Sequence, residues 1–213
     1  MGIFLKKHLK IAGFTLNEVV ITIFIIGILS AIAIPGIIQW MPNMEIKGAA
    51  RGIYSAMQEA KSIAIYENIL TGTAVFFDNT VTPNTYQILR DPGVDGNWGT
   101  GGDDTNPAPG PDGIYGNADD IPEDPPMSLP IRVTFNTNAT TNATTGGGGF
   151  PADFISYNNN IVVFNKQGYL FNAGFTGYVY IANLNTSYAI GTPAVSGRIM
   201  LFEWKPASAA WFR

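Results

Sequence analysis

A repeated acidic motif lies in the middle of the chain, between residues 91 and 124. Each copy has a leading aspartate, an aromatic residue, turn glycines and a closing pair of aspartates. The aspartates of the two copies are Asp95, Asp103, Asp104, Asp112, Asp119 and Asp120. Calcium takes about six to eight oxygen ligands in flexible geometry, which carboxylates on a glycine-rich backbone can supply. The repeat therefore predicts a calcium site.

The same segment has a plainer interpretation as a solvated acidic loop. Neither copy is an EF-hand, because the ligand ladder of that motif and its final glutamate are missing. Repetition of the whole unit favours calcium, so the metal site is our prediction and the plain loop is its alternative.

Glu18 is a further carboxylate in an unusual setting. It stands at the edge of a run, residues 19–44, in which every residue is uncharged and most are Ile, Leu, Val, Ala, Phe or Met. A carboxylate that had to reach the middle of a bilayer would cost on the order of 2 to 3 kcal/mol. Glu18 is therefore predicted to be a functional residue.

The rest of the composition argues against catalysis. The chain has no cysteine, and its one histidine, His8, precedes the apolar run. Ser-His, Cys-His and His-ligated zinc chemistry thus lack their residues in the rest of the chain. Paired carboxylates could serve a glycosidase, but no cleft motif accompanies them. The formal net charge of -4 argues against nucleic-acid binding. We predict that the protein is not an enzyme.

The elements that must position Glu18 begin with the apolar run, which exceeds the roughly 20 residues that cross a bilayer as a helix. Residues 1–13 contain three lysines and no acid, and positive charge keeps its side of a span in the cytoplasm. The rest of the chain, after this single transmembrane helix, is therefore expected outside the cytoplasm. Pro35 lacks the N–H of a helical hydrogen bond and is expected to kink or locally melt this helix.

The junction before the apolar run resembles that of type IV prepilins, and it reads Gly13-Phe14-Thr15-Leu16-Asn17-Glu18. This class has a short basic leader, a glycine followed by Phe-Thr-Leu, and a glutamate five residues into the mature chain. Asn17 departs from the pattern, because an aliphatic residue is usual there. An ordinary secretory signal differs, since its cleavage site follows the apolar run.

The resemblance implies that a prepilin peptidase cleaves between Gly13 and Phe14, that the new amine is methylated and that the apolar helix is kept. The Glu18 carboxylate is then expected to pair with the Phe14 amine of an adjacent subunit. Pro35 is implied to be a melting point that lets subunits pack into a filament. A tolerated kink of a membrane helix is the alternative for Pro35.

After residue 44 the period of the sequence changes to that of an amphipathic helix, continuous with the span and ending near Asn68. Its predicted buried positions are Ile46, Ala50, Ile53, Met57, Ala60 and Ala64. Beyond it, strands are predicted at residues 71–78, 85–91, 129–136, 154–157, 161–165, 169–171, 178–182 and 198–204. In the third of these, Ile131, Val133 and Phe135 are expected on one face, opposite Arg132 and Thr134.

The predicted fold is α+β, with a long hydrophobic helix, kinked at Pro35, whose amphipathic C-terminal half packs on an antiparallel β-sheet domain. It has four parts: a cleaved basic leader (1–13), a transmembrane or filament-core segment (14–44), an amphipathic helix half (45–68) and a β-rich domain (69–213). The domain carries the acidic insert 91–124 and a loop, 137–149, whose Asn, Thr and Gly composition predicts flexibility.

Two segments are similar to the GspH or FimT branch of this class. One is the helix at residues 51–62, where Lys61 replaces a usual arginine; the other is the ending with Gly168, residues 177–181 and a final Gly197-Arg198-Ile199. The resemblance implies a minor pseudopilin of a type II secretion pseudopilus or a minor pilin of a type IV pilus. Its place would be the bacterial inner membrane, with the globular domain in the periplasm or on a surface filament.

The partners implied are prepilin peptidase, other pilin or pseudopilin subunits, the inner-membrane assembly platform and, before assembly, membrane lipid. A different class of protein stays open. The chain could be a single-pass membrane-anchored calcium-binding or adhesive domain that forms no filament.

Overall fold

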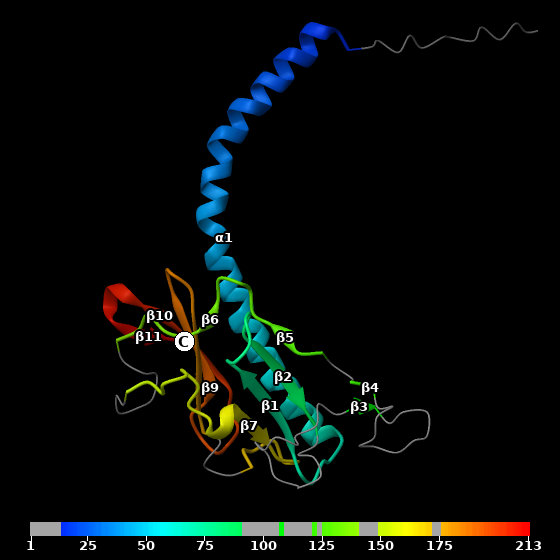
Figure 1. Cartoon of the computed structure of the whole chain (residues 1–213), viewed down its shortest axis with the longest axis vertical. Helices are drawn as coiled ribbons and strands as arrows, with labels where there is room; N and C mark the ends of the chain where they lie inside the picture. The colour runs from blue at the N-terminus through cyan, green and yellow to red at the C-terminus, as the bar shows by residue number, and fades with distance from the viewer. Residues whose placement is uncertain (1–13, 91–106, 109–120, 123–124, 141–148, 172–175) are drawn as a thin grey trace, which may run out of the picture. The chain divides into compact units, whose positions relative to one another are not determined.

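A computed structural model describes residues 14–90, 107–108, 121–122, 125–140, 149–171 and 176–213. The chain forms two compact units, Met1–Met41 and Pro42–Arg213. The long helix α1 (Leu16–Tyr66) contributes residues to both units (Figure 1). Each unit is described by itself.

The first unit contains the apolar part of α1. Residues Leu16–Ile38 are long and apolar enough to cross a membrane, and none of the most apolar window is buried. The helix continues through Pro35, so the predicted local melting is not found in the chain by itself. Because proline has no N–H, the carbonyl of Ala31 still lacks its usual helical donor.

The second unit contains the amphipathic part of α1, whose buried stripe follows the predicted pattern. Ile46, Ala50, Ile53, Met57, Ala60 and Ala64 are all fully buried, and Ala49 and Ala56 extend the stripe. The helix ends at Tyr66, and Asn68 adopts a left-handed backbone with φ of 54°, which stops helical propagation. The predicted end near Asn68 is confirmed.

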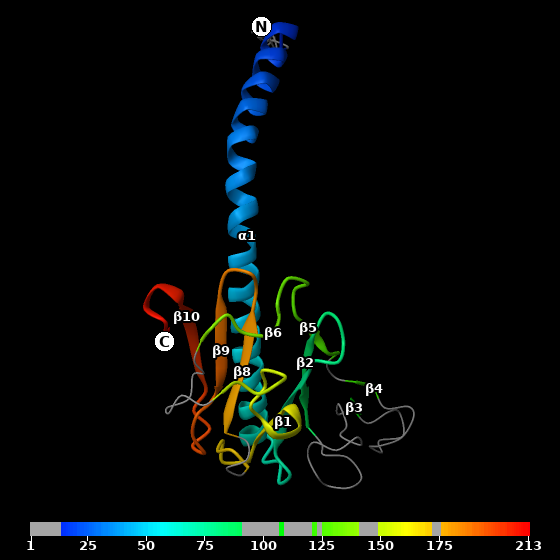
Figure 2. The same ribbon diagram turned by 60° about the vertical axis from the view of Figure 1, so that its left-hand side comes forward.

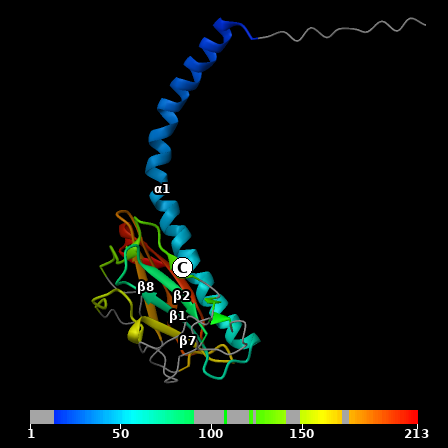
Figure 3. The same ribbon diagram turned by 45° about the vertical axis from the view of Figure 1, so that its right-hand side comes forward.

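Two antiparallel sheets pack with this part of the helix (Figures 2 and 3). The first sheet has the strand order β5 (Met127–Ser128), β2 (Thr85–Leu89), β1 (Thr73–Asp78) and β7 (Ile161–Phe164). The second has the order β11 (Ala210–Phe212), β10 (Met200–Lys205), β9 (Ser187–Thr192), β8 (Gly177–Ala182) and β6 (Thr134–Phe135). A separate pair joins β3 (Pro107–Ala108) to β4 (Ile121–Pro122), and short 3-10 helices are η1 (Asn158–Asn160) and η3 (Pro206–Ser208).

The main core lies between α1 and both sheets. Alternation along each strand divides its side chains between two faces. On β1, Val75 belongs to the cluster with the helix, whereas Ala74 packs on the opposite face of the sheet. On β8, Val179 faces the helix and Tyr180 joins an outer aromatic cluster that includes Trp211. The same strands thus contribute side chains to the core beside the helix and to the smaller clusters on the outer faces of the sheets.

Several predicted strands differ from the structure. Ile131 is 88% exposed and does not share the buried face of Val133 and Phe135, because the chain turns there and the Val133 N–H donates to the Pro130 carbonyl at 2.8 Å. The predicted strands at 154–157 and 169–171 are single bridges, Ile155 to Val179 and Phe164 to Leu170. Strands β9 and β11 were not predicted, since neither has a clear alternation of apolar and polar residues.

The predicted flexible loop at 137–149 begins as an ordered segment. The Asn138 N–H donates to Ser187 Oγ at 2.7 Å, and Asn138 Nδ2 donates to the Asn183 carbonyl at 2.7 Å. These bonds connect the start of the segment to strand β9 and to the turn before it. The flexibility of the loop stays a prediction. Residues 141–148 lie outside the described part of the chain.

Candidate functional site

The first turn of α1 is closed by a capping motif. The backbone N–H of Glu18 lies 3.3 Å from Thr15 Oγ1 and 3.1 Å from the Thr15 carbonyl. Thr15 therefore caps the helix, and its spacing to Glu18 is that of a capping box, in which a Ser or Thr precedes a Glu by three residues. The sequence analysis missed this role, although the spacing alone signals it.

Glu18 consequently has a local effect besides any role in assembly. A carboxylate in the first helical turn is stabilised by the partial positive charge of the exposed backbone N–H groups there. Both Glu18 and Phe14 are exposed, and Phe14 has 82% of its surface accessible. The same terminus thus presents an aromatic residue and a carboxylate that are free to meet other molecules.

The remaining predicted site residues are not gathered at this terminus. Gly13 lies outside the described residues. Pro35 lies 17 positions after Glu18, which corresponds to about 25 Å along a helix. Glu18 and Pro35 therefore lie at different levels of one helix.

The flank of the helix from residue 19 to residue 41 is apolar on every side. All its large apolar side chains are exposed, with values from 44% at Val19 to 75% at Ile32. Burying one such side chain contributes about 1.5 to 3 kcal/mol. This surface therefore requires a covering that the first unit itself does not contain.

Polar contacts join the sheets to the part of α1 with which the second unit begins, at Pro42 and Glu45. Asn183 is buried and donates from Nδ2 to the Pro42 carbonyl at 2.7 Å. Its Oδ1 accepts the N–H groups of Asn185 and Thr186, both at 2.9 Å, which closes the turn between β8 and β9. A second contact joins Arg132 to Glu45 at 3.8 Å. Sequence reasoning missed Asn183, whose signal is a polar turn between two apolar strands.

The six aspartates of the predicted calcium site all lie outside the described residues. In the part of the chain that the structure describes, no group of three or more His, Cys, Asp or Glu residues is placed to hold a metal ion. The calcium prediction accordingly rests on the acidic repeat of the sequence.

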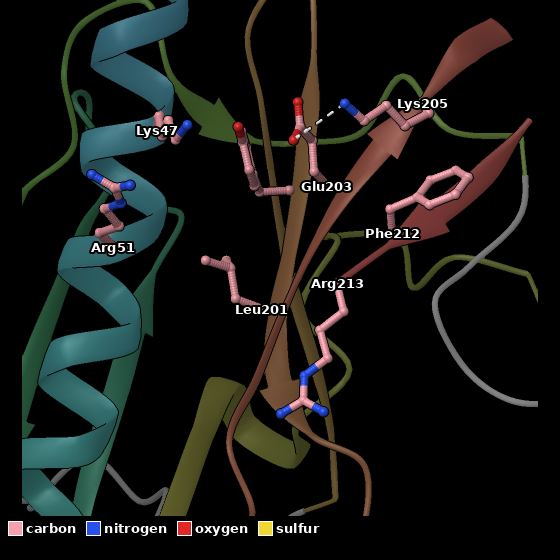
Figure 4. A pocket seen from close by; sticks show the side chains of 8 residues that line it. Lys47, Arg51, Leu201, Glu203, Lys205, Phe212 and Arg213 are labelled. Atoms are coloured by element: carbon pink, nitrogen blue, oxygen red, sulfur yellow. Dashed lines mark ion pairs between the residues drawn. The ribbon is translucent and has the colours of Figure 1, made fainter. Parts of the chain in front are cut away.

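A basic pocket of about 260 Å³ opens on the second unit (Figure 4). Lys47 and Arg51 contribute from α1, and Glu203 and Lys205 contribute from β10, where their charged groups lie 3.7 Å apart. Tyr188 of β9 shares a hydrogen bond with Glu203. Burial raises the pKa of Tyr188, the nearby Glu203 charge raises it further and Arg51 opposes both effects.

Among the described residues, the geometry does not identify a set of catalytic side chains. No family model, curated protein or solved structure matches this chain. Function is therefore inferred from the exposed helix, its capped terminus and the pocket. The first two suit assembly or anchoring, and the pocket suits recognition of an anionic group.

Proposed function

We propose that the chain is a minor subunit of a bacterial filament of the type IV pilin class, either a secretion pseudopilus or a type IV pilus. The observation that supports this proposal is the exposed apolar half of α1, next to a half that is buried in a folded domain. The helix would lie in the inner membrane as a single span before assembly. It would then pack with helices of other subunits in the filament core.

The two environments satisfy the same physical requirement. A helix that is apolar all round is stable where lipid or other apolar helices cover it. Because its backbone groups, apart from the Ala31 carbonyl opposite Pro35 and the groups at the helix end, are bonded within the helix, the segment can pass from lipid to a protein core with few unpaired polar groups. The assembly platform would move the helix from the membrane into the filament. The chain itself needs no catalytic residue for this transfer.

The N-terminal resemblance adds a specific chemical expectation. Removal of residues 1–13 would create an amine at Phe14, four residues before the Glu18 carboxylate. In an apolar filament core an unpaired carboxylate is unfavourable, so the amine of an adjacent subunit is its expected partner. The capping role of Thr15 would keep Glu18 in its helical position while this pair forms.

Mass spectrometry of the protein purified from membranes tests the processing step. The expected N-terminus is Phe14, and a Gly13→Leu variant should keep its leader. A Gly2→Leu variant makes the same replacement away from the junction and should be processed normally. Finding Met1 or Gly2 as the only N-terminus in cells with active prepilin peptidase would rule out the proposed class.

Glu18 is tested by a charge change that preserves shape. A Glu18→Gln protein should insert into the membrane and be processed, yet its recovery in sheared filaments should fall strongly. Asn17→Gln changes the neighbouring exposed residue and should leave recovery unchanged. Normal incorporation of Glu18→Gln would show that this carboxylate is not the assembly contact.

The alternative class, a membrane-anchored domain that forms no filament, also accounts for an exposed span. It predicts that the protein stays entirely in the membrane fraction, without cross-links between copies of the apolar helix. Cysteines placed at Ile23 and Ile32 in separate variants provide the test, because the native chain has none. Disulfides between helices in the filament fraction support assembly, and recovery of both variants in the membrane fraction alone supports the anchored domain.

Calcium binding by residues 91–124 is proposed as a separate property of the domain. Six carboxylates close in sequence repel one another, and a bound cation would relieve that repulsion. Calcium at about a hundredfold excess over its dissociation constant should stabilise the folded protein by about 2.7 kcal/mol. Melting the full chain in detergent with chelator, calcium or magnesium tests this, with a smaller shift expected for magnesium. An unchanged midpoint in calcium favours the solvated loop.

A further inference from the structure

The basic pocket has a charge balance opposite to that of the chain. The sequence contains 16 acidic residues and 12 lysines and arginines. The pocket, in contrast, is lined by four basic side chains, those of Lys47, Arg51, Lys205 and Arg213, and by the single carboxylate of Glu203. Such a concentration of positive charge on an acidic protein attracts anions.

Most of these cations have no carboxylate partner within the described residues. Glu203 lies 3.7 Å from Lys205, whereas the described ion pairs leave Lys47, Arg51 and Arg213 without one. Lys47 and Arg51 are exposed and stand four positions apart, hence on one face of α1 (Figure 4). Two like charges at this spacing repel each other, which an incoming anion would relieve.

The pocket is shaped for more than a free ion. Leu201 and Phe212 add apolar surface beside the charged groups. Arginine can bind a carboxylate through two parallel hydrogen bonds, and the apolar surface can receive the carbon atoms that carry it. The combination fits an acidic peptide segment.

The chain contains a segment of matching charge. Residues 91–124 include nine acidic residues and no lysine or arginine. These nine are more than half of the 16 acids in the whole sequence. We propose that the basic pocket docks the acidic segment 91–124 of a second copy of this chain.

The contact is heterologous, because one copy contributes the pocket and the other the acidic segment. The first copy then retains an unused acidic segment and the second an unused pocket, so the contact can be repeated from copy to copy. It concerns the second unit alone and does not depend on cleavage at Gly13. Its failure would therefore leave the proposed filament function untouched, and failure of processing would leave this contact untouched.

A binding titration tests the proposal with the full chain in detergent and a fluorescent peptide of residues 91–124, in chelator so that no cation masks the carboxylates. We expect binding that weakens steeply as salt rises from low to physiological strength. A Lys47→Gln, Arg51→Gln double variant should bind about tenfold more weakly. Arg198→Gln removes one exposed positive charge that does not line the pocket and should change the affinity less than twofold.

Three outcomes would overturn the proposal. Equal affinity of the wild-type chain and the double variant would show that the pocket is not the docking site. Equal binding of a peptide with every acid replaced by its amide would show that charge is not recognised. Binding of the chain to anionic phosphatidylglycerol vesicles through Lys47 and Arg51, with no binding of the peptide, would assign the pocket to lipid. Near-ultraviolet circular dichroism verifies that each variant is folded.

Discussion

The two halves of α1 have the same backbone structure and opposite surroundings. From Val19 to Met41 the large apolar side chains are exposed, whereas from Ile46 to Ala64 an apolar stripe is completely buried. The first half is apolar on all faces, and the second alternates apolar and charged residues. One continuous helix can therefore combine a surface for external partners with a surface for its own domain.

This difference separates stability from assembly. Contacts of the second half are made inside the domain and should contribute to its free energy of unfolding. Contacts of the first half must be made with lipid or with other subunits, so they should contribute to membrane insertion and assembly. Substitutions in the two halves are expected to affect different measurements.

The largest expected effect comes from matched isoleucines. Ile53→Ala should lower the free energy of unfolding of the domain by about 2 to 5 kcal/mol, since Ile53 is fully buried. Ile28→Ala removes the same atoms from an exposed position and should change it by less than about 0.5 kcal/mol. Urea unfolding in detergent, followed by near-ultraviolet circular dichroism, measures both. Similar effects of the two variants would contradict the division of the helix.

Alkaline pH should also act on the second unit. Tyr157 is buried and stacks on Phe77, and its hydroxyl forms a hydrogen bond of 3.1 Å with Thr192 Oγ1. Burial raises the pKa of Tyr157 above its ordinary value. Above about pH 10 the unfolded chain loses this proton while the folded chain keeps it, so stability falls with rising pH by up to about 1.4 kcal/mol per pH unit.

The Tyr157→Phe variant tests this contribution. It should lose about 1 kcal/mol of stability at neutral pH, because the hydrogen bonds of the hydroxyl are gone. Its stability should then decline less steeply above pH 10 than that of the wild type. Unfolding curves at pH 7 to 11 provide the measurement, and Tyr169→Phe, at a half-exposed position, serves as the control. An unchanged alkaline slope in Tyr157→Phe would refute the assignment.

A smaller and local effect is expected at the start of α1. Thr15→Ala removes the cap and should destabilise the first helical turn by about 1 kcal/mol. Faster hydrogen exchange of the amides of residues 16–19 would report it. The melting midpoint of the domain should not change, and Thr22→Ala is a matched replacement about two turns inside the helix. A lowered midpoint in Thr15→Ala would show that the two halves are coupled.

The smallest expected effect concerns the ion pair of Arg132 and Glu45. Both side chains keep contact with solvent, and their charged groups lie 3.8 Å apart. A double-mutant cycle with Arg132→Gln and Glu45→Gln should give a coupling energy of about 0.2 to 1 kcal/mol that falls with added salt. A larger coupling would mean that this turn of the domain is held by charge, and not mainly by Asn183 and the apolar stripe.

Local sequence patterns were sufficient to predict the helix and several strands. The spacing from Ile46 to Ala64 predicted six of the buried positions, because a helix places residues three and four apart on one face. Ala49 and Ala56 were not predicted. Runs rich in β-branched and aromatic residues predicted β1 and β8 to within two residues. Alternation, which predicted a strand at residues 129–136, was wrong at Ile131, because the turn after Pro130 interrupts the strand.

Sequence alone indicates the long apolar helix, its amphipathic continuation, the acidic segment and the motif around Gly13, Phe14 and Glu18. Each depends on residues that are neighbours along the chain. The tertiary structure decided what distant residues do together, including the burial of β9, the bond from Asn183 to Pro42 and the basic pocket. Lys47 and Lys205 are separated by more than 150 positions, and only the packing of β10 near α1 places them on one pocket. Sequence patterns reflect local periodicity, whereas such sites depend on which surfaces bury each other.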